Sequence, residues 1–355
     1  MKWQGIVGQY ESAEEFAARF YTEGHYLIDS PQQLKLEKAI SEGTYAEAAA
    51  VTNCGMAAIG SVLEALVTRR KGILFSNSLF PGTQRLAESY QQKGFYVRFT
   101  DPTRLDEVKE HLRSYPFSLY FFEIIGNSME MPVVDWYETM EVLAGTGAKA
   151  VVDTTFVPVF HPFLQKNGKV EVIEVASMSK WETVSDAVAG GRISGSAERI
   201  AQIKNSSHYR QVCMQPEIAE RISLERLEKV FPLFSVLTLD AARVLEESPG
   251  VAKVYYPRLA SHPQNSLTEK QFNSSGGGVL YLVLKGGEEA ATKLTNLLSH
   301  RPFWSIAPSF GAEEWRIFPY IGELQKYAPV SGLVRIAAGE TVGAVKALEK
   351  ALGRL

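Results

Sequence analysis

The feature that most constrains this 355-residue chain is a regular alternation of short apolar segments with amphipathic helices. Residues 11–22, residues 31–40 and the run that begins at Met56 all have helical patterns. Short runs typical of strands alternate with the helices, at residues 72–75, 95–99, 118–122, 148–152, 170–176 and 188–194. Strands that alternate with helices form a mostly parallel sheet wrapped by helices. The sequence therefore predicts an α/β domain.

The pattern changes after about residue 235. A helical segment at 236–248 is followed by Pro- and Gly-rich stretches and by strand candidates at 278–284 and 332–338, which no longer alternate regularly with helices. We therefore expect three parts: an N-terminal segment in residues 1–40, a large α/β domain in residues 41–235, and a smaller C-terminal α+β domain in residues 236–355.

Polar side chains gather where the predicted strands end. Glu123 and Asn127 follow one strand, Asp153 ends the next, and Lys180 follows a third. Ligands of open α/β sheets bind beyond the carboxyl ends of the strands. A lysine amine with a carboxylate on a neighbouring strand end suits pyridoxal phosphate (PLP), because the amine forms a Schiff base and the carboxylate pairs with the ring nitrogen. The alternatives are a solvated Lys180 and an Asp153 that caps a turn.

A phosphate group needs its own binding site, and residues 53–56 offer one where a strand turns into a helix. The N–H groups and the positive dipole at a helix start favour an anion, and Gly55 lets the backbone approach closely. Ser177 and Ser179 add hydroxyl donors. The competing interpretation of Gly55 is an ordinary turn.

Two further residues stand out from their surroundings. Phe80 lies in a turn-like run and is suited to stacking on a flat heteroaromatic ring, although a core phenylalanine is the commoner outcome. Arg335 places a charge inside an apolar strand, so it needs a partner if it is buried. That partner is either a substrate carboxylate held by two hydrogen bonds or an internal acidic residue.

Composition narrows the class of partner. The net charge of −3 and the absence of a basic block argue against nucleic acid or an anionic membrane. Two cysteines fit a reducing compartment, no run approaches a membrane span of about 18 apolar residues, and the N-terminus lacks a secretory pattern. The six histidines are scattered, without a paired metal-binding spacing. We expect a cytoplasmic protein that acts on small molecules and has no metal site.

The ordered segments together resemble the Cys/Met-metabolism family of PLP-dependent enzymes, which includes cystathionine γ-lyase, cystathionine γ-synthase and methionine γ-lyase. The resemblance covers nearly the whole chain. It is carried by ESAEEFAARF with Tyr26, CGMAAI (54–59), FPGT (80–83), EIIGN (123–127), VVDTTF (151–156), SMSK (177–180) with SDAVAGG, VYYPRLASHP (254–263), SFG (309–311) and LVRIAAG (333–339). It implies the fold type I architecture of PLP-dependent transferases.

The resemblance also implies roles for individual residues. Lys180 would carry the Schiff base and move protons. The residues that would bind the cofactor are Tyr26, Gly55, Met56, Phe80, Asn127, Asp153, Thr155, Ser177 and Ser179. Within this set Asp153 pairs with the pyridinium, Phe80 stacks, and Asn127 contacts the 3-hydroxyl side of the ring. The α-carboxylate of the substrate would be bound by Arg335, Asn127 and Ser309.

The chain departs from the family pattern at two places. Phe80 replaces a tyrosine whose hydroxyl assists proton transfer, and Ile28 stands where the family has an arginine that reaches the neighbouring subunit's phosphate. Tyr26 would still serve a partner subunit, so a homodimer or homotetramer is expected. The arm before residue 11 is short, which leaves the substrate pocket and the oligomer state open.

The implied activity is γ-elimination or γ-replacement on an L-amino acid, through a vinylglycine-type intermediate. The loss of the hydroxyl at Phe80 suggests a leaving group that needs little protonation, such as a halide or an acyl ester. Two alternatives remain: another PLP reaction, such as β-elimination from a cysteine-like substrate or a decarboxylation, and a catalytically degenerate binding protein. Lys180 and Asp153 argue against the degenerate protein.

Overall fold

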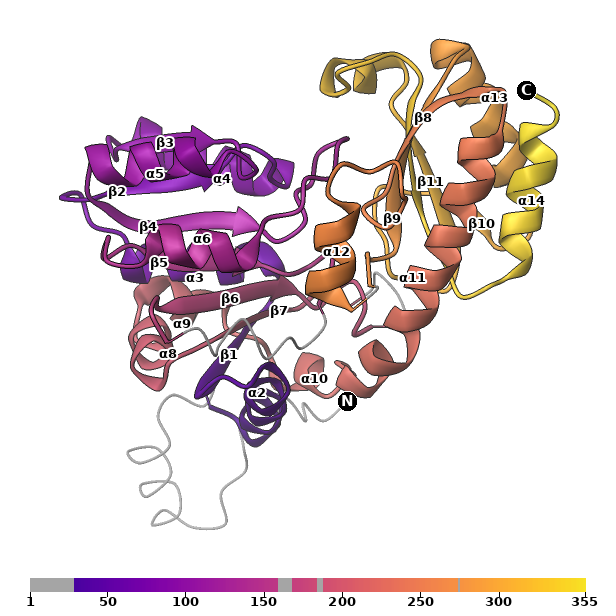
Figure 1. The fold of residues 1–355 in the computed structure, drawn as a ribbon. Coiled ribbons are helices and arrows are strands. Elements are labelled where there is room, and N and C mark those ends of the chain that lie inside the picture. Colours follow the sequence, from indigo (N-terminus) through magenta and orange to yellow (C-terminus); the bar gives the residue numbers. More distant parts are fainter. Residues whose placement is uncertain (1–28, 159–167, 184–187, 274) are drawn as a thin grey trace, which may run out of the picture.

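The computed structural model describes residues 29–158, 168–183, 188–273 and 275–355, which form two β-sheets joined by a long helix (Figure 1). The first sheet has the order β1-β7-β6-β5-β4-β2-β3. Its strands are β1 (Ala48–Thr52), β2 (Gly72–Ser76), β3 (Val97–Thr100), β4 (Phe117–Glu123), β5 (Lys149–Asp153), β6 (Val172–Ser177) and β7 (Gly191–Gly195). All neighbouring pairs are parallel except the two that β7 makes. The predicted mostly parallel sheet is confirmed.

Both faces of the first sheet are covered by helices. Ile73 and Phe75 of β2 pack with the core on one face, whereas Leu74 between them belongs to the core on the other. The first face carries α3 (Gly55–Leu66), α4 (Pro81–Gln92), α8 (Ala197–Lys204) and α9 (Ser207–Val212), and the second carries α5 (Leu105–Ser114) and α6 (Trp136–Leu143). Every residue of β2 and β4 is buried, which explains their unbroken apolar character.

The N-terminal end of the described chain is the helix α2 (Pro31–Thr44), which packs beside β1. Ser30 caps it: its Oγ accepts from the Gln33 N–H at 3.3 Å, and its own N–H donates to Gln33 Oε1 at 2.9 Å. Pro31 occupies the first turn, where a missing N–H costs nothing. These local signals explain why residues 31–40 could be predicted as a helix. The helix predicted at residues 11–22 lies outside the described residues.

The second sheet is mainly antiparallel and has the order β10-β11-β12-β9-β8. Its strands are β8 (Val251–Tyr255), β9 (Val279–Leu284), β10 (Trp304–Ile306), β11 (Trp315–Pro319) and β12 (Leu333–Ala337). The remaining helices are α10 (Pro216–Ala219), α11 (Leu224–Glu247), α12 (Asn265–Phe272), α13 (Gly287–Ser299), α14 (Gly343–Leu352) and the 3-10 helix η1 (Gly322–Tyr327). The smaller second sheet agrees with the predicted C-terminal α+β architecture.

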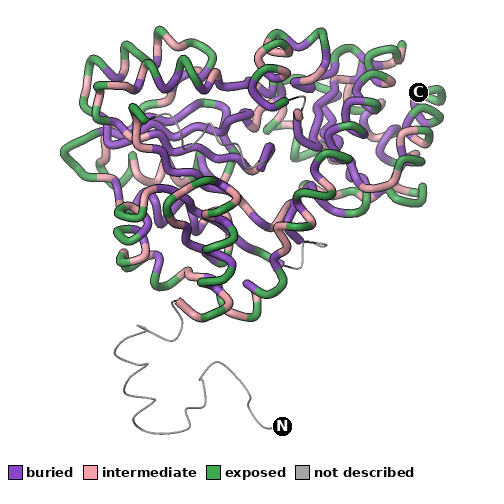
Figure 2. The backbone as a smooth tube through the Cα atoms, turned by 60° about the horizontal axis from the view of Figure 1, so that its bottom comes forward, coloured by how far each residue is buried: buried purple, intermediate pink, exposed green. Residues whose placement is uncertain are grey.

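The two sheets share a continuous hydrophobic core, which contains side chains of β4 and α6 as well as β9, α11 and α13. Buried segments run through both halves of the molecule (Figure 2). Two amides at α12 tie the halves together: the N-cap residue Gln264 accepts from the Val133 N–H at 2.7 Å, and Gln271 within the helix accepts from the Trp136 N–H at 2.9 Å. The domain boundary expected near residue 235 falls inside α11 and stays a prediction.

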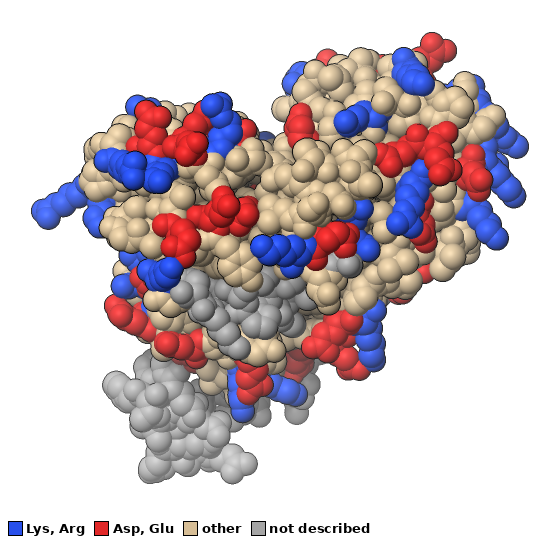
Figure 3. Space-filling model, in the orientation of Figure 1, with Lys and Arg blue, Asp and Glu red and all other residues tan. Residues whose placement is uncertain are grey.

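Acidic and basic side chains are interspersed over the face of the molecule seen in Figure 3. Among the described residues, no helix is both long and apolar enough to cross a membrane.

Candidate active site

A cavity of about 230 Å³ lies at the carboxyl edge of the first sheet and reaches the second sheet. Its walls come from the segments that follow β1, β2, β4, β5 and β6, together with the loop before β11 and strand β12. The lining residues are Cys54, Gly55, Met56, Ile59, Phe80, Thr83, Glu123, Asn127, Asp153, Thr155, Phe156, Ser177, Ser179, Lys180, Pro308, Phe310 and Arg335. The parallel first sheet and the loop and strand of the second sheet together bring residues separated by more than 250 positions to one cavity.

Lys180 stands on the turn after β6 and its amine meets the second sheet's loop. The Nζ atom donates to Ser309 Oγ at 2.9 Å and lies 5.3 Å from the centre of the Phe310 ring. Gly311 has φ +84°, and a Cβ there would lie 2.1 Å from the Lys180 carbonyl oxygen. Only glycine allows this close approach, so the glycine of the SFG segment fixes how the loop meets Lys180.

Asp153 ends β5, and its carboxyl group is buried. Its Oδ1 accepts from the Thr155 N–H at 2.8 Å, and Thr155 Oγ1 accepts in turn from the Ser177 N–H at 2.9 Å. Burial raises the pKa of Asp153 to about 6, against the lowering effect of the Thr155 hydrogen bonds and the more distant Arg192 charge. A cation placed beside this carboxylate would relieve the cost of its burial.

The start of α3 forms another part of the cavity wall. A Cβ on Gly55 would lie 2.8 Å from the Ser177 Cβ atom, so glycine keeps this corner open. The N–H groups of a first helical turn have no acceptor within the helix and favour an anion. Ser179 Oγ accepts from the Gly190 N–H at 3.0 Å and still lines the cavity. This corner has the donors and the space that a phosphate needs.

Phe80 is the N-cap of α4 and is 46% exposed, so it is not a core phenylalanine. Its backbone N–H donates to Glu123 Oε1 at 2.5 Å. Burial, with the nearby Asp153 charge, raises the pKa of Glu123 well above its usual range. Glu123 thus anchors the backbone of the residue predicted to stack on the cofactor.

Arg335 projects from the buried strand β12 into the cavity. Its guanidinium donates to the Pro308 carbonyl oxygen and lies 5.7 Å from the Phe318 ring centre. No ion pair between described residues includes Arg335, so the internal acidic partner weighed from the sequence is not found among them. Asn127 lines the same cavity, and its Oδ1 accepts from the Tyr281 hydroxyl at 3.2 Å.

Apart from Tyr26, the predicted cofactor- and substrate-binding residues are therefore gathered at one place. Ser309 contacts Lys180, and the others line the cavity. Tyr26 lies outside the described residues. The individual roles assigned to these residues stay predictions. The described residues contain no cluster of three or more His, Cys, Asp or Glu side chains that could hold a metal ion.

The sequence interpretation missed a buried charge network under the Lys180 turn. Arg192 of β7 contacts Glu174 of β6 at 2.9 Å and Glu182 at 3.1 Å, and the three side chains are at most 2% exposed. Thr154, next to Asp153, donates to Glu174 Oε1 at 2.6 Å. Glu174 and Arg192 each interrupt an apolar strand, the same signal that singled out Arg335, and it could have revealed this pair.

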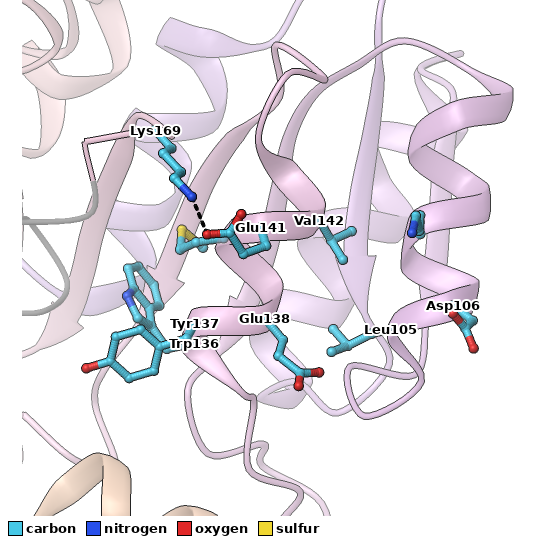
Figure 4. A pocket seen from close by; sticks show the side chains of 10 residues that line it. Leu105, Asp106, Trp136, Tyr137, Glu138, Glu141, Val142 and Lys169 are labelled. Atoms are coloured by element: carbon cyan, nitrogen blue, oxygen red, sulfur yellow. Dashed lines mark hydrogen bonds and ion pairs between the residues drawn. The ribbon is translucent and has the colours of Figure 1, made fainter.

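A second hollow, of about 730 Å³, is lined by residues of α5 and α6 and by Lys169. Its lining contains an ion pair between Lys169 and Glu141, next to Trp136 and Tyr137 (Figure 4). None of the predicted site residues lines it. The first cavity is therefore the candidate active site.

Comparison with known proteins shows which family the chain matches. The family described as Cys/Met metabolism PLP-dependent enzyme matches residues 12–326. An L-methionine gamma-lyase of Fusobacterium nucleatum subsp. polymorphum is 28% identical over 351 residues, which cover 93% of this chain and 86% of that protein. Cystathionine gamma-synthase 1 of Arabidopsis thaliana is 28% identical over 80% of this chain and 50% of its own length. Cystathionine beta-lyase of Lactococcus lactis subsp. cremoris is 26% identical over 80% and 73%.

The fold has solved counterparts. Cystathionine gamma synthase from Xanthomonas oryzae pv. oryzae superimposes with a TM-score of 0.79 at 24% identity, covering 92% of this chain and 86% of that one. The family match spans most of the chain and includes the Lys180 turn, the Asp153 strand end and the α3 start. The chain belongs to the Cys/Met metabolism family of PLP-dependent enzymes, and it is a PLP-dependent lyase or transferase.

Proposed function

We propose that this enzyme eliminates or replaces the γ-substituent of an L-amino acid. The observation that carries the proposal is that Lys180, Asp153 and Arg335 line one cavity of about 230 Å³. In one cavity, Lys180 offers an amine, Asp153 an acidic partner for a cationic ring nitrogen, and Arg335 a guanidinium that can bind a carboxylate. This arrangement supports action on one small substrate. Relatives named methionine gamma-lyase and cystathionine gamma-synthase support the γ-carbon as the site of bond cleavage.

The residues of the cavity fit PLP. Asp153 would hold the proton of the ring nitrogen, Phe80 would cover a ring face, and the corner of Gly55, Met56, Ser177 and Ser179 would bind the phosphate. When bound, the cofactor supplies an aldehyde that joins the amino group and a ring that withdraws electrons from Cα. The open corner at Gly55 and the raised pKa of Asp153 both support this assignment.

Of the described residues that line the cavity, Lys180 alone carries an amine. With the substrate's amino group joined to the cofactor in its place, this amine would take the proton from Cα, give that proton up again, and only then take a proton from Cβ. Arg335 and Asn127 would hold the α-carboxylate, which keeps Cα within reach of Lys180. Ser309 accepts from Lys180 Nζ and would orient the amine between its two tasks.

The position of the broken bond can be read from the products. For a substrate X–CH₂–CH₂–CH(NH₃⁺)–COO⁻, γ-elimination with one water yields HX, ammonium and 2-oxobutanoate, whereas a three-carbon β-substituted substrate yields pyruvate. The PLP-loaded enzyme should be given L-methionine, O-acetyl-L-homoserine, L-cysteine and O-acetyl-L-serine. We expect 2-oxobutanoate from the four-carbon substrates, or a thioether product when a thiol is added.

Pyruvate as the main product would overturn the proposal in favour of β-elimination. This alternative is tested because the chain is also similar to a cystathionine beta-lyase. Lys180→Ala is the catalytic control and should abolish every product. Lys204→Ala removes a lysine that pairs with Glu37 at 2.9 Å, outside the cavity, and should leave the product ratio unchanged.

We further propose that the enzyme works in the cytoplasm as a homodimer or homotetramer in which Tyr26 serves a neighbouring site. Two free thiols among the described residues support a reducing compartment. Co-expression of Tyr26→Ala with Lys180→Ala tests the shared site. In a dimer, random pairing restores about a quarter of the sites if Tyr26 acts across the interface, and restores none if it acts within its own subunit.

A further inference from the structure

The second sheet presents two long polar side chains side by side to the active site. Arg335 of β12 and Tyr281 of β9 are register partners in an antiparallel pair. Residues directly opposite in such a pair point to the same face of the sheet. Arg335 lines the cavity, and Tyr281, which is 3% exposed, reaches Asn127 beside it.

The Tyr281 hydroxyl joins the two halves of the molecule. It donates to Oδ1 of Asn127, which follows β4 of the first sheet, at an O···O distance of 3.2 Å. A phenol carries a single proton, so its oxygen is left to accept from another donor. Tyr320 lies close by; burial raises its pKa, and its interaction with Tyr281 contributes to that rise. The direction of donation that matters for the cavity runs from Tyr281 to Asn127.

This order decides which end of the Asn127 amide is available. An amide has one carbonyl oxygen and one NH₂ group, and here the oxygen is occupied by Tyr281. The NH₂ group is then the part of Asn127 that remains for a ligand in the cavity. Arg335 beside it has donors only. A wall made of amide N–H and guanidinium N–H groups suits a carboxylate and leaves a neutral amide or ester poorly paired.

We propose that Tyr281 is a positioning residue that turns the NH₂ group of Asn127 into the cavity beside Arg335 and so makes the site selective for a free α-carboxylate. This inference rests on the proposed function, because it takes Arg335 as the carboxylate-binding residue. Without the phenol, the Asn127 amide can rotate and place its oxygen toward the substrate carboxylate. The partial negative charge of that oxygen then repels the carboxylate.

The test uses Tyr281→Phe, which removes one oxygen and keeps the buried ring. The ligands are L-norvaline, which has no leaving group, and L-norvalinamide, titrated calorimetrically into the PLP-loaded enzyme. We expect Tyr281→Phe to weaken norvaline binding about tenfold, which corresponds to about 1.4 kcal/mol, and to change norvalinamide binding less than about twofold. With a reacting substrate, KM should rise about tenfold while kcat changes less than about twofold.

Two controls separate this role from general loosening of the fold. Tyr255→Phe makes the same change on β8, at the register partner of Tyr281 on its other side, and should leave both affinities within about twofold. In an Asn127→Ala background, Tyr281→Phe should have no further effect, because the residue through which it acts is gone.

The inference is overturned if Tyr281→Phe leaves norvaline binding unchanged, if it weakens both ligands equally, or if its effect survives in Asn127→Ala. Arg335→Ala tests the proposed function separately. If Arg335→Ala leaves norvaline binding unchanged, the carboxylate site itself is wrong. If it weakens binding strongly while Tyr281→Phe does not, only the role of Tyr281 fails.

Discussion

Removal of the Arg192 charge should strongly destabilise the fold. Its guanidinium is fully buried between Glu174 and Glu182, at 2.9 and 3.1 Å. Glu174 also accepts from Thr154 and Ser194, at 2.6 and 3.3 Å. Arg192→Met keeps a long apolar stem and deletes the charge. The variant therefore leaves two buried carboxylates facing one another without a cation.

The size of the loss follows from the burial. Removing one partner of a buried ion pair costs about 3–5 kcal/mol, because the other charge is left uncompensated. A domain has a total stability of about 5–15 kcal/mol, so such a loss is severe. We expect Arg192→Met to lower the free energy of unfolding of the cofactor-free protein by about 4 kcal/mol at pH 8.

The loss should also depend on pH, with a sign that identifies its cause. Burial already raises the pKa of Glu182 in the native protein, and the Arg192 charge opposes that rise. Without Arg192 the folded-state pKa moves further above the unfolded value of 4.5. A carboxyl group with a raised folded pKa keeps the fold stable while protonated and destabilises it as pH rises through that pKa. The deficit of the variant should therefore be smaller at pH 5 than at pH 8, by more than about 1.4 kcal/mol.

Urea unfolding followed by tryptophan fluorescence at pH 5 and pH 8 measures both effects. Arg199→Met is the matched control, since Arg199 pairs with Glu171 at 2.6 Å but its side chain is 24% exposed. It should cost less than about 1 kcal/mol at either pH. Adding Glu174→Gln and Glu182→Gln to Arg192→Met should recover most of the loss at pH 8. An equal deficit at both pH values would refute the electrostatic explanation, and a deficit under about 1 kcal/mol at pH 8 would refute the pairing itself.

Three further changes test the candidate site. Gly55→Ala puts a methyl 2.8 Å from Ser177 Cβ and should weaken PLP binding at least about tenfold by fluorescence titration, whereas Gly343→Ala, whose Cβ meets no atom closer than 3.9 Å, should leave it unchanged. Asp153→Asn should weaken PLP binding yet raise the stability of the cofactor-free protein at pH 8 by up to about 3 kcal/mol. The pKa of Asp153 is raised from 3.8 to about 6, so the cost of its ionisation in the fold grows between these two pH values and is complete above pH 6; an equal gain at pH 4 would contradict this. Phe80→Tyr should speed the reaction of L-methionine, which loses a thiol, more than that of O-acetyl-L-homoserine. If the variant and the parent enzyme turn over each of the two substrates at the same rate, the argument about leaving groups is wrong.

Local patterns in the sequence were enough to predict much of the first sheet. Strands β2 and β4 are buried along their whole length because helices cover both faces, so both stood out as short apolar runs bounded by turns. The capping residues Ser30 and Gln33 marked the start of α2 equally clearly. Lys180 and Asp153 could be paired in advance because parallel strands end at one edge of a sheet, whatever lies between them in the chain.

Residues that act through long-range contacts were harder to find. Tyr281 looks like an ordinary aromatic residue in a strand, and only the packing of β9 against the loop after β4 brings its hydroxyl to Asn127. The direction of β7 was also not predictable from its own pattern, because VAGGRIS fits a parallel or an antiparallel strand equally well. That direction matters, since it puts Arg192 opposite Ala176 and within reach of the turn that carries Lys180.

The buried acidic groups near the active site explain why a cationic cofactor ring would be favoured there. Glu123, Asp153, Glu174 and Glu182 are all buried at or beneath the carboxyl edge of the sheet. Burial raises the pKa of Glu123, Asp153 and Glu182. Arg192 lies between Glu174 and Glu182, so its charge is shared most closely with them, and Asp153 is affected only at longer range. A ligand with a protonated ring nitrogen would bring a second cation to the carboxylate that Arg192 serves least. The same burial that makes Asp153 costly in the empty fold therefore makes it a strong partner for such a ring.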